Sequence, residues 1–282
     1  MPDLIVNADD FGRSAGINRG ILEAHQRGIV TSTTAMMNYP AVVPGLETAL
    51  EVAPDLGIGV HLNLTSGRPL LPPESVPTLV DADGRFYGPD ALPHAGRRWA
   101  ADDLHRELSA QVDRFLQLTG RPPTHLDSHH GAALVLPEAL RVTLSLAAKY
   151  GIPIRRPPLA DTAQQTARGS WILSRFPGDH AREVAGELHA IMDAHPGVRM
   201  PARFVSRFYD RLAILGELLV ILTTLPPAGV TELMCHPGYA DGLDSPYAAP
   251  RERELAALVH HAAHEVVAAE NIRLMTFAEL PR

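Results

Sequence analysis

Short apolar runs alternate with helix-length amphipathic segments along almost the whole chain, and this rhythm limits the folds open to it. The alternation predicts parallel strands joined by crossover helices. About eight strands in a chain of this length favour a closed or nearly closed (β/α) barrel, TIM-like and irregular, with an open doubly wound sheet as the alternative. The expected strands are 4–8, 33–37, 57–64, 124–128, 152–155, 202–206, 231–235 and 272–277. The expected helices are 15–27, 41–53, 101–119, 137–149, 180–194, 209–224 and 250–269.

The chain of 282 residues is long enough for two domains, but barrels of this kind run to about 250 residues as one domain. We therefore expect a single barrel domain over residues 1–282. Two stretches interrupt the rhythm, the proline-rich segment 66–98 and the segment 157–178, which has no clear periodicity. We expect both to be long loops inserted into the scaffold, where barrels carry their substrate contacts.

Composition excludes several classes of protein. The net charge is −7 and acidic and basic residues are interleaved, which disfavours a nucleic-acid partner. Cys235 is the one cysteine, so no intrachain disulfide can form. A strand that begins by Leu4 leaves no room for a signal peptide, and the most apolar stretch, 212–225, is too short to span a bilayer. We expect a soluble, cytoplasmic protein with no membrane partner. The amphipathic outer helices could serve a homodimer, although the outer helices of any barrel have this pattern.

Acidic residues follow the first strand directly. In "LIVNADDFG" the side chains of Asn7 and Asp9 share one face of the strand, and Asp10 lies at the turn that follows. Two adjacent carboxylates repel each other unless a cation or a proton compensates them. The alternative is that both favour the positive end of a helix that begins near Ser14.

Histidines and a further aspartate follow three other expected strands. His61 ends one strand together with Asn63, and His236 ends another directly after Cys235. The segment "HLDSHH" places His125, Asp127 and His129 on one face by period two. A turn after the strand could bring in His130 as well. Barrels and open α/β sheets build their sites at the carboxyl ends of strands. A mixed Asp and His set there is typical of a divalent-metal hydrolase. Cys235 should face away from His236 as a small buried residue.

The ordered motifs "NADDFG", "GVHLNLT", "HLDSHHG", "ELMCHPGY" and "RERELAAL" resemble those of the YdjC/ChbG carbohydrate deacetylases over about residues 4–277. The resemblance implies a (β/α) barrel of the polysaccharide-deacetylase type. It implies removal of acetyl groups from N-acetylated sugars, notably chitin-derived oligosaccharides, with one divalent metal such as magnesium or zinc.

The resemblance also implies roles for single residues. The metal ligands fall on Asp10, His61 and His125, the general base on Asp9 and the general acid on His236. Beyond these, we expect Asp127 to orient a ligand imidazole from the outer shell, as such carboxylates do. His129 could be a further ligand or a sugar contact. Asn63 and Tyr239 are weaker candidates for substrate contacts.

Three other functions are open on the residues alone. A metal-dependent phosphoesterase or other amidohydrolase could use similar ligands, but it should carry more Lys or Arg near the strand ends than Arg13. A non-catalytic sugar-binding barrel should have lost Asp9 or His236. A glycosidase needs two carboxylates that flank the scissile bond, and Asp9 and Asp10 are too close for that.

Overall fold

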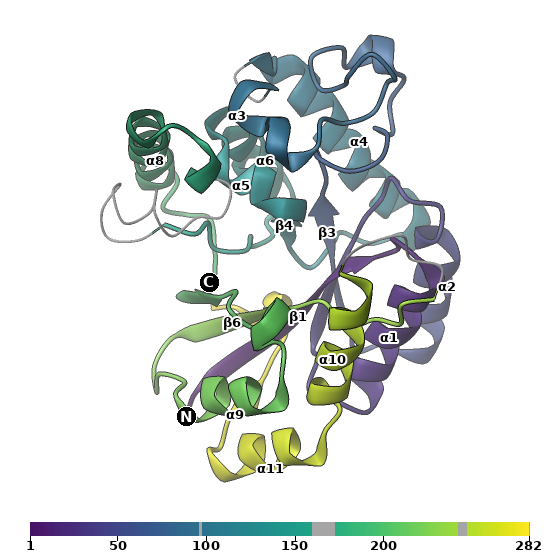
Figure 1. Cartoon of the computed structure of the whole chain (residues 1–282), viewed down its shortest axis with the longest axis vertical. Helices are drawn as coiled ribbons and strands as arrows, with labels where there is room; N and C mark the ends of the chain where they lie inside the picture. The colour runs from purple at the N-terminus through teal and green to yellow at the C-terminus, as the bar shows by residue number, and fades with distance from the viewer. Residues whose placement is uncertain (96–97, 160–172, 242–246, 282) are drawn as a thin grey trace. The chain divides into compact units, whose positions relative to one another are not determined.

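The computed structural model describes residues 1–95, 98–159, 173–241 and 247–281 (Figure 1). The chain divides into two compact units, one formed by residues 1–59 and 200–282 and the other by residues 60–199. We call them unit 1 and unit 2. The expectation of a single domain stays a prediction. The expected loop at 66–98 is described except for residues 96–97, and most of the one at 157–178 lies outside the described residues.

Unit 1 contains a parallel sheet in the order β2-β1-β6-β5, and β7 also pairs with β1. Residues Leu4, Ile5 and Val6 of β1 are fully buried, which explains why this strand reads as a continuous apolar run. The strands described here are β1 (Asp3–Phe11), β2 (Ser32–Ala35), β5 (Arg203–Val205), β6 (Val230–Cys235) and β7 (Arg273–Leu274).

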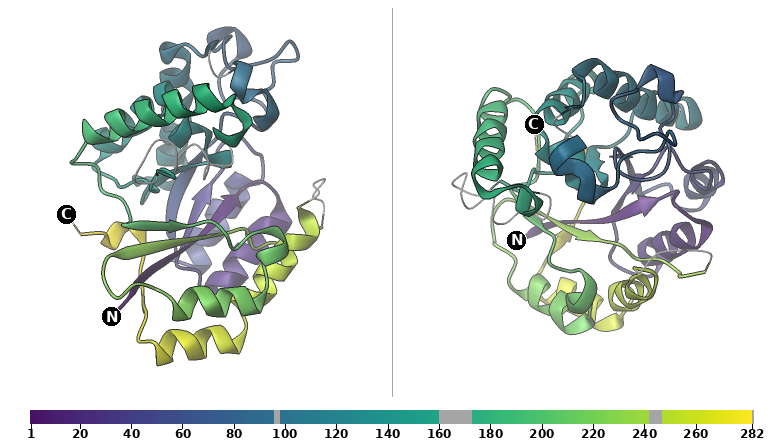
Figure 2. Two further views of the ribbon diagram at one scale, coloured as in Figure 1. Left: turned by 60° about the vertical axis from the view of Figure 1, so that its left-hand side comes forward. Right: turned by 45° about the horizontal axis from the view of Figure 1, so that its top comes forward.

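Helices of unit 1 pack beside these strands and against one another. Helix α1 packs against β1, α2 and α10, and α9 packs against α10 and α11, as the views in Figure 2 show for α9 and α11. Ser14 caps α1 by accepting a hydrogen bond from the N–H of Ile17 at 3.2 Å. The helices of unit 1 are α1 (Ala15–Gln26), α2 (Val42–Val52), α9 (Leu215–Thr223), α10 (Ala248–Leu258) and α11 (His261–Ala269), with short 3₁₀ turns η6 (Asp210–Leu212) and η7 (Phe277–Glu279).

In unit 2 the end of β3 (Gly57–Leu62) pairs in parallel with β4 (Leu126–Ser128), with Val60, His61 and Leu62 opposite Leu126, Asp127 and Ser128. Strand β3 begins in unit 1 and ends in unit 2. Helix α6 packs against α4, α5 and α8. The helices of unit 2 are α3 (Leu92–Ala95), α4 (Ala101–Thr119), α5 (Ala132–Val135), α6 (Pro137–Tyr150) and α8 (Gly178–Asp193), with 3₁₀ turns η1 (Pro73–Ser75), η2 (Pro89–Ala91), η4 (His129–Gly131) and η5 (Leu173–Arg175).

One face of α4 holds the loop that follows β3. Glu107 accepts hydrogen bonds from the N–H groups of Leu70 and Leu71 at 3.0 and 3.1 Å. Gln111 pairs with the backbone of Asn63 in both directions at 2.9 and 2.8 Å, and one turn before Glu107 the Asp103 carboxylate accepts from Thr78. All three helix side chains are buried, so this part of the expected loop at 66–98 has a defined path.

Four expected elements differ clearly from the structure, and one of them, the strand expected over 272–277, is only Arg273–Leu274. The helix expected over 250–269 is two helices, because the chain breaks at His260, whose side chain caps α11 by accepting from the N–H of Ala262. The strand expected over 152–155 is a single bridge between Leu126 and Ile154. The helix expected over 209–224 begins as the 3₁₀ turn η6 before α9.

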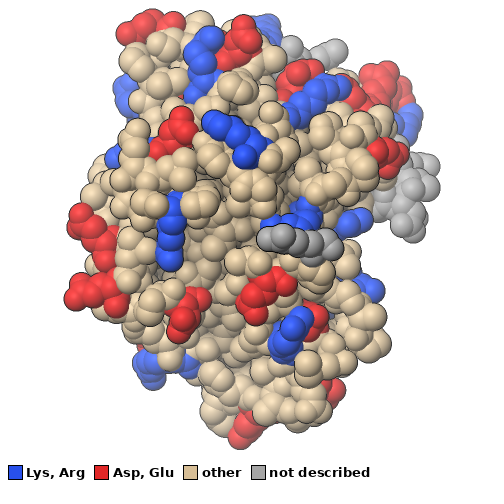
Figure 3. Space-filling model, turned by 180° about the vertical axis from the view of Figure 1, so that it is seen from behind, with Lys and Arg blue, Asp and Glu red and all other residues tan. Residues whose placement is uncertain are grey.

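Charged side chains on the face drawn in Figure 3 are interspersed, with acidic and basic groups close to one another. Among the described residues no single helix is long and apolar enough to cross a bilayer. One pair of helices, His129–Val135 and Pro137–Tyr150, passes a test of length and hydropathy only when taken together, and it is bent by 88°.

Candidate active site

The two adjacent carboxylates of unit 1 lie in a bulge at the end of β1. The pairing of β1 with β2 shifts register between Ala8 and Phe11, and Asp10 has a φ of +73°. This left-handed conformation is rare outside glycine, and bulges and such conformations are common next to active sites. The bulge lets Asp9 continue the face of Asn7, whose amide donates to Asp9 Oδ1 at 2.9 Å, while Asp10 takes different partners.

Asp10 is compensated by arginines. Arg251 of α10 forms a salt bridge with Asp10 Oδ2, and both side chains are 2% exposed. Arg13 lies 3.5 Å from the same oxygen. The helix α1 is capped by Ser14, so the alternative in which the two aspartates cap it is not needed. A buried guanidinium therefore offsets the repulsion that the sequence presents at Asp9 and Asp10.

His236 lies between two carboxylates of unit 1. Its Nε2 is 4.0 Å from Asp9 Oδ2, and its Nδ1 is 4.0 Å from Glu254 Oε1. Its backbone N–H donates to Glu254 Oε2 at 2.5 Å, so the segment after β6 is fastened to α10. Cys235 faces the other way, as expected: it is buried, and its thiol donates to the carbonyl of Asn7 at 3.4 Å.

Burial raises the pKa of Glu254 to about 8, although hydrogen bonds from Tyr247 and the His236 backbone and the charge of Arg251 act in the opposite direction. The carboxyl is fully buried. Glu254 can therefore hold or release a proton near neutral pH beside His236, which is a property useful to a general acid.

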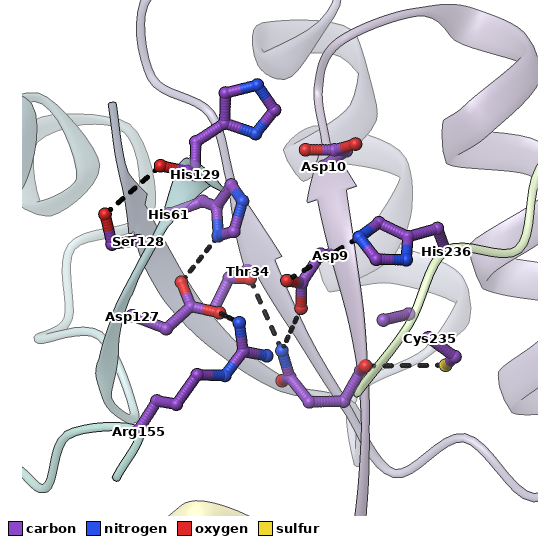
Figure 4. Close-up of polar contacts among 12 residues, drawn as sticks. Asp9, Asp10, Thr34, His61, Asp127, Ser128, His129, Arg155, Cys235 and His236 are labelled. Atoms are coloured by element: carbon purple, nitrogen blue, oxygen red, sulfur yellow. Dashed lines mark hydrogen bonds and ion pairs between the residues drawn. The ribbon is translucent and has the colours of Figure 1, made fainter. Parts of the chain in front are cut away.

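In unit 2, His61 is fixed by a buried ion pair. Its Nδ1 is 2.6 Å from Asp127 Oδ1, and Arg155 Nη1 is 3.0 Å from the other oxygen of Asp127 (Figure 4). Because a carboxylate only accepts, this contact places the proton of a neutral His61 on Nδ1 and leaves the lone pair on Nε2. A carboxylate behind the far nitrogen is the arrangement that orients metal-binding imidazoles. The expected role of Asp127 thus has a geometric basis in its contact with His61.

His129 is the histidine that unit 2 brings next to His61. Their ring centroids are 5.3 Å apart, and the ring of His130 lies 3.9 Å from that of His129. His130 has a φ of +53° in η4, so the chain turns directly after β4. The side chain of His125 is buried and its Nδ1 contacts Thr124 Oγ1 at 3.0 Å. Among the described residues, the metal-capable groups that contain His61 include His129 or Asp127, and none includes His125.

Two weaker candidates for substrate contacts take part in other interactions. The side chain of Asn63 accepts from the N–H groups of Thr65 and Ser66 and donates to the carbonyl of Ser66, so it shapes the loop after β3. Tyr239 donates to Glu23, and its ring faces the guanidinium of Arg19 at 5.2 Å.

Sequence reasoning missed three charged residues that support the site. Arg251 and Glu254 lie in "RERELAAL", three positions apart and therefore on one side of α10. The available signal was that this segment is one of the ordered motifs, but a sequence does not show which side of a helix is buried when both sides are charged. Arg155 is the last residue of the expected strand 152–155 and gave no signal of its own.

Comparisons with known proteins identify the family. The protein family described as "YdjC-like protein" matches residues 3–269 of this chain. The chain belongs to the YdjC-like family. Its relatives include proteins named carbohydrate deacetylase from Enterococcus faecalis strain V583 and Brevibacillus brevis strain 47. The first is 33% identical, and the alignment covers 98% of this chain and 97% of the relative. The second is 35% identical, and the alignment covers 98% of this chain and 99% of the relative.

Solved structures support the fold of this YdjC-like chain. A crystal structure from Enterococcus faecalis V583, of a protein proposed to cleave cellobiose phosphate, has a TM-score of 0.81 at 32% identity and covers 98% of this chain and 97% of its own. The Xyl-CE4 domain of a xylanase from the hindgut metagenome of Trinervitermes trinervoides has a TM-score of 0.51 at 8% identity, with 99% and 88% covered. The second likeness shows the fold alone. The expected (β/α) barrel of the polysaccharide-deacetylase type is confirmed.

Proposed function

We propose that this chain is a carbohydrate deacetylase that hydrolyses the acetamide of N-acetylated sugars, such as oligosaccharides that contain N-acetylglucosamine. The names of its relatives support this activity, since they align over nearly their whole length. The observation that carries the proposal is the pair Asp9 and His236 in unit 1, an acceptor and a donor of protons 4.0 Å apart at the ends of neighbouring strands.

We propose that Asp10, His61 and His125 hold one divalent metal, magnesium or zinc, as the family resemblance implies. The donor types fit, because carboxylate oxygen binds both metals and imidazole nitrogen suits zinc in particular. The tautomer of His61 also fits, since Asp127 leaves its Nε2 with a lone pair. His129, whose ring contacts that of His61, is the alternative to His125 as the third ligand. A bound metal supplies Lewis acidity and lowers the pKa of water.

The chain's own groups move the protons. Asp9 accepts a proton from the water that attacks the acetyl carbon, and the amide of Asn7 keeps its carboxylate oriented by binding Oδ1. His236 donates a proton to the departing amine, which is a poor leaving group without it. Glu254 lies behind the other ring nitrogen of His236 and favours its protonated form when ionised.

Acetate release tests the activity. The purified protein is incubated with N-acetylglucosamine, its oligomers and cellobiose phosphate, with and without a chelator. Acetate from the acetylated sugars, lost with the chelator and restored by added metal, supports the proposal. Cleavage of cellobiose phosphate without any acetate release would replace the deacetylase with the activity proposed for the structural relative.

Single variants test the roles. Asp9→Asn and His236→Ala should each lower kcat by at least about a hundredfold, the usual size of a proton-transfer contribution. Cys235→Ala is the matched control, because this neighbour of His236 faces the opposite side of β6 and should keep full activity. Full activity of either site variant removes that residue from its role.

Metal content tests the ligands separately. His61→Ala should lose the metal, and full stoichiometry in that variant would contradict its assignment. A comparison of His125→Ala with His129→Ala decides the third ligand: the variant that loses the metal names it. Cytoplasmic location and a homodimer stay predictions.

A further inference from the structure

Two tyrosines and the proposed general acid form an aromatic cluster in unit 1. The rings of Tyr209 and Tyr247 are stacked, with centroids 4.3 Å apart and planes inclined by 6°. His236 meets both rings edge to face, at 5.5 Å from Tyr209 and 5.7 Å from Tyr247. We call these three side chains the tyrosine cluster.

The inner ring of the cluster is held on several sides. Tyr247 donates to Glu254 Oε1 at 2.5 Å and accepts from the N–H of Asp210 at 2.8 Å. The guanidinium of Arg251 lies over its ring at 5.6 Å. Tyr247 is therefore a fixed base on which Tyr209 rests, and the position of Tyr209 is set before any ligand arrives.

The outer ring is exposed. Tyr209 is 46% exposed, although one of its faces is covered by Tyr247 and its edge meets His236. No hydrogen bond of its hydroxyl to another described residue is present. Burial raises the pKa of Tyr209, so the phenol stays neutral at ordinary pH and its hydroxyl remains a donor. A fixed, half-exposed aromatic face beside a proton donor is suited to stack on a ring of a bound ligand.

We propose that Tyr209 is the stacking platform for a pyranose ring of the substrate, the sugar next to the one that loses its acetyl group. The inference rests on the proposed function. The C–H groups on the face of a pyranose carry partial positive charge, and the face of an aromatic ring carries partial negative charge, so the two attract each other. A sugar ring is neutral, as is the tyrosine pair, so stacking on Tyr209 leaves no charge to be compensated.

The position explains why the neighbouring sugar is the occupant. Tyr247 covers one face of Tyr209, so a ligand ring can stack only on the opposite, outer face of Tyr209. His236 is almost equally distant from the two tyrosine rings, so it lies beside the stacked pair and not over the outer face of Tyr209. The scissile amide must reach His236, so the ring on Tyr209 is a sugar that adjoins the reacting group.

The test compares a monosaccharide with an oligosaccharide. For Tyr209→Ala, the ratio of kcat/KM for N,N′-diacetylchitobiose to that for N-acetylglucosamine should fall about five- to tenfold, because a stacking contact is lost only for the longer substrate. Tyr209→Phe keeps the aromatic face and should keep the ratio. Val220→Ala, an exposed apolar residue of α9, is the matched control and should also keep it. An unchanged ratio in Tyr209→Ala, or an equal fall in Tyr209→Phe, overturns the proposal.

Binding separates this inference from the proposed function. Titration calorimetry with the deacetylated disaccharide product measures its Kd for the wild-type protein, Tyr209→Ala and Tyr209→Phe without any turnover. A Kd raised about five- to tenfold in Tyr209→Ala and unchanged in Tyr209→Phe supports the platform. If the wild-type protein releases no acetate, the proposed function fails, and the same titration still decides whether Tyr209 holds a sugar. No difference among the three proteins overturns the platform whatever the activity.

Discussion

The buried ion pair between Arg251 and Asp10 makes the sharpest prediction about stability. Arg251→Met keeps much of the side-chain volume and removes the guanidinium, so it leaves Asp10 with a buried charge. Breaking a buried ion pair from one side costs about 3–5 kcal/mol. Arg13 lies 3.5 Å from Asp10 and is itself 20% exposed, so it compensates part of the lost charge. We therefore expect the lower end of that range, about 3 kcal/mol.

The measurement is the free energy of unfolding in urea, with a chelator present so that no metal contributes. A loss of about 3 kcal/mol should also lower Tm by about 6 °C for a chain of this size. Arg273→Met is the matched control, because Arg273 makes a bidentate pair with Asp3 at 2.8 Å while it is 49% exposed. This exposed pair should contribute about 0–1 kcal/mol.

A double variant checks the physical cause. If the cost of Arg251→Met comes from the stranded charge of Asp10, then adding Asp10→Asn should restore part of the lost stability, since a neutral amide tolerates burial better than a carboxylate. Equal unfolding free energies for Arg251→Met and Arg273→Met would refute the reasoning, as would additive losses in the double variant.

Three further outcomes are expected. The Glu254 carboxyl titrates at about 8 in the folded chain and near its ordinary 4.5 when unfolded, so the folded state binds the extra proton and stability falls as pH rises through this window. Glu254→Gln should flatten that decline in urea unfolding measured at several pH values. Gly20→Ala should lower Tm, because the added Cβ would lie 2.5 Å from the Cα of Gly238. Gly186→Ala is the control in the exposed part of α8: its Cβ would meet nothing within 4 Å, so it should raise the free energy of unfolding by about 0.5–1 kcal/mol. Asp127→Asn should weaken metal binding about 10- to 100-fold in equilibrium dialysis while the chain stays folded, because an amide can donate as well as accept and no longer fixes the proton of His61 on Nδ1.

Local pattern was enough for much of the fold. The apolar runs of β1 and β6 and the long amphipathic pattern of α4 are properties of each segment by itself, so the local sequence was enough to predict these elements. The break at His260 was missed because an apolar helical pattern continues on both sides of it. The strand expected at 152–155 was reduced to one bridge, since strand formation depends on a partner that the segment does not contain.

The candidate site shows the same division. Period two correctly placed Asn7 and Asp9 on one face, which their hydrogen bond confirms. The cation beside Asp10 could not be read from the sequence, because Arg251 is distant in the chain and nothing local distinguishes a buried arginine from an exposed one. The metal ligands and catalytic roles stay predictions from the family resemblance.

The way α4 holds the loop after β3 has a consequence for how this family can diversify. Glu107 and Gln111 bind main-chain N–H and carbonyl groups of residues 63, 70 and 71, and every amino acid except proline supplies such an N–H. Side chains along that loop can therefore be exchanged by mutation while its course is preserved. Evolution can in this way alter what the loop presents to solvent without first having to invent a new backbone.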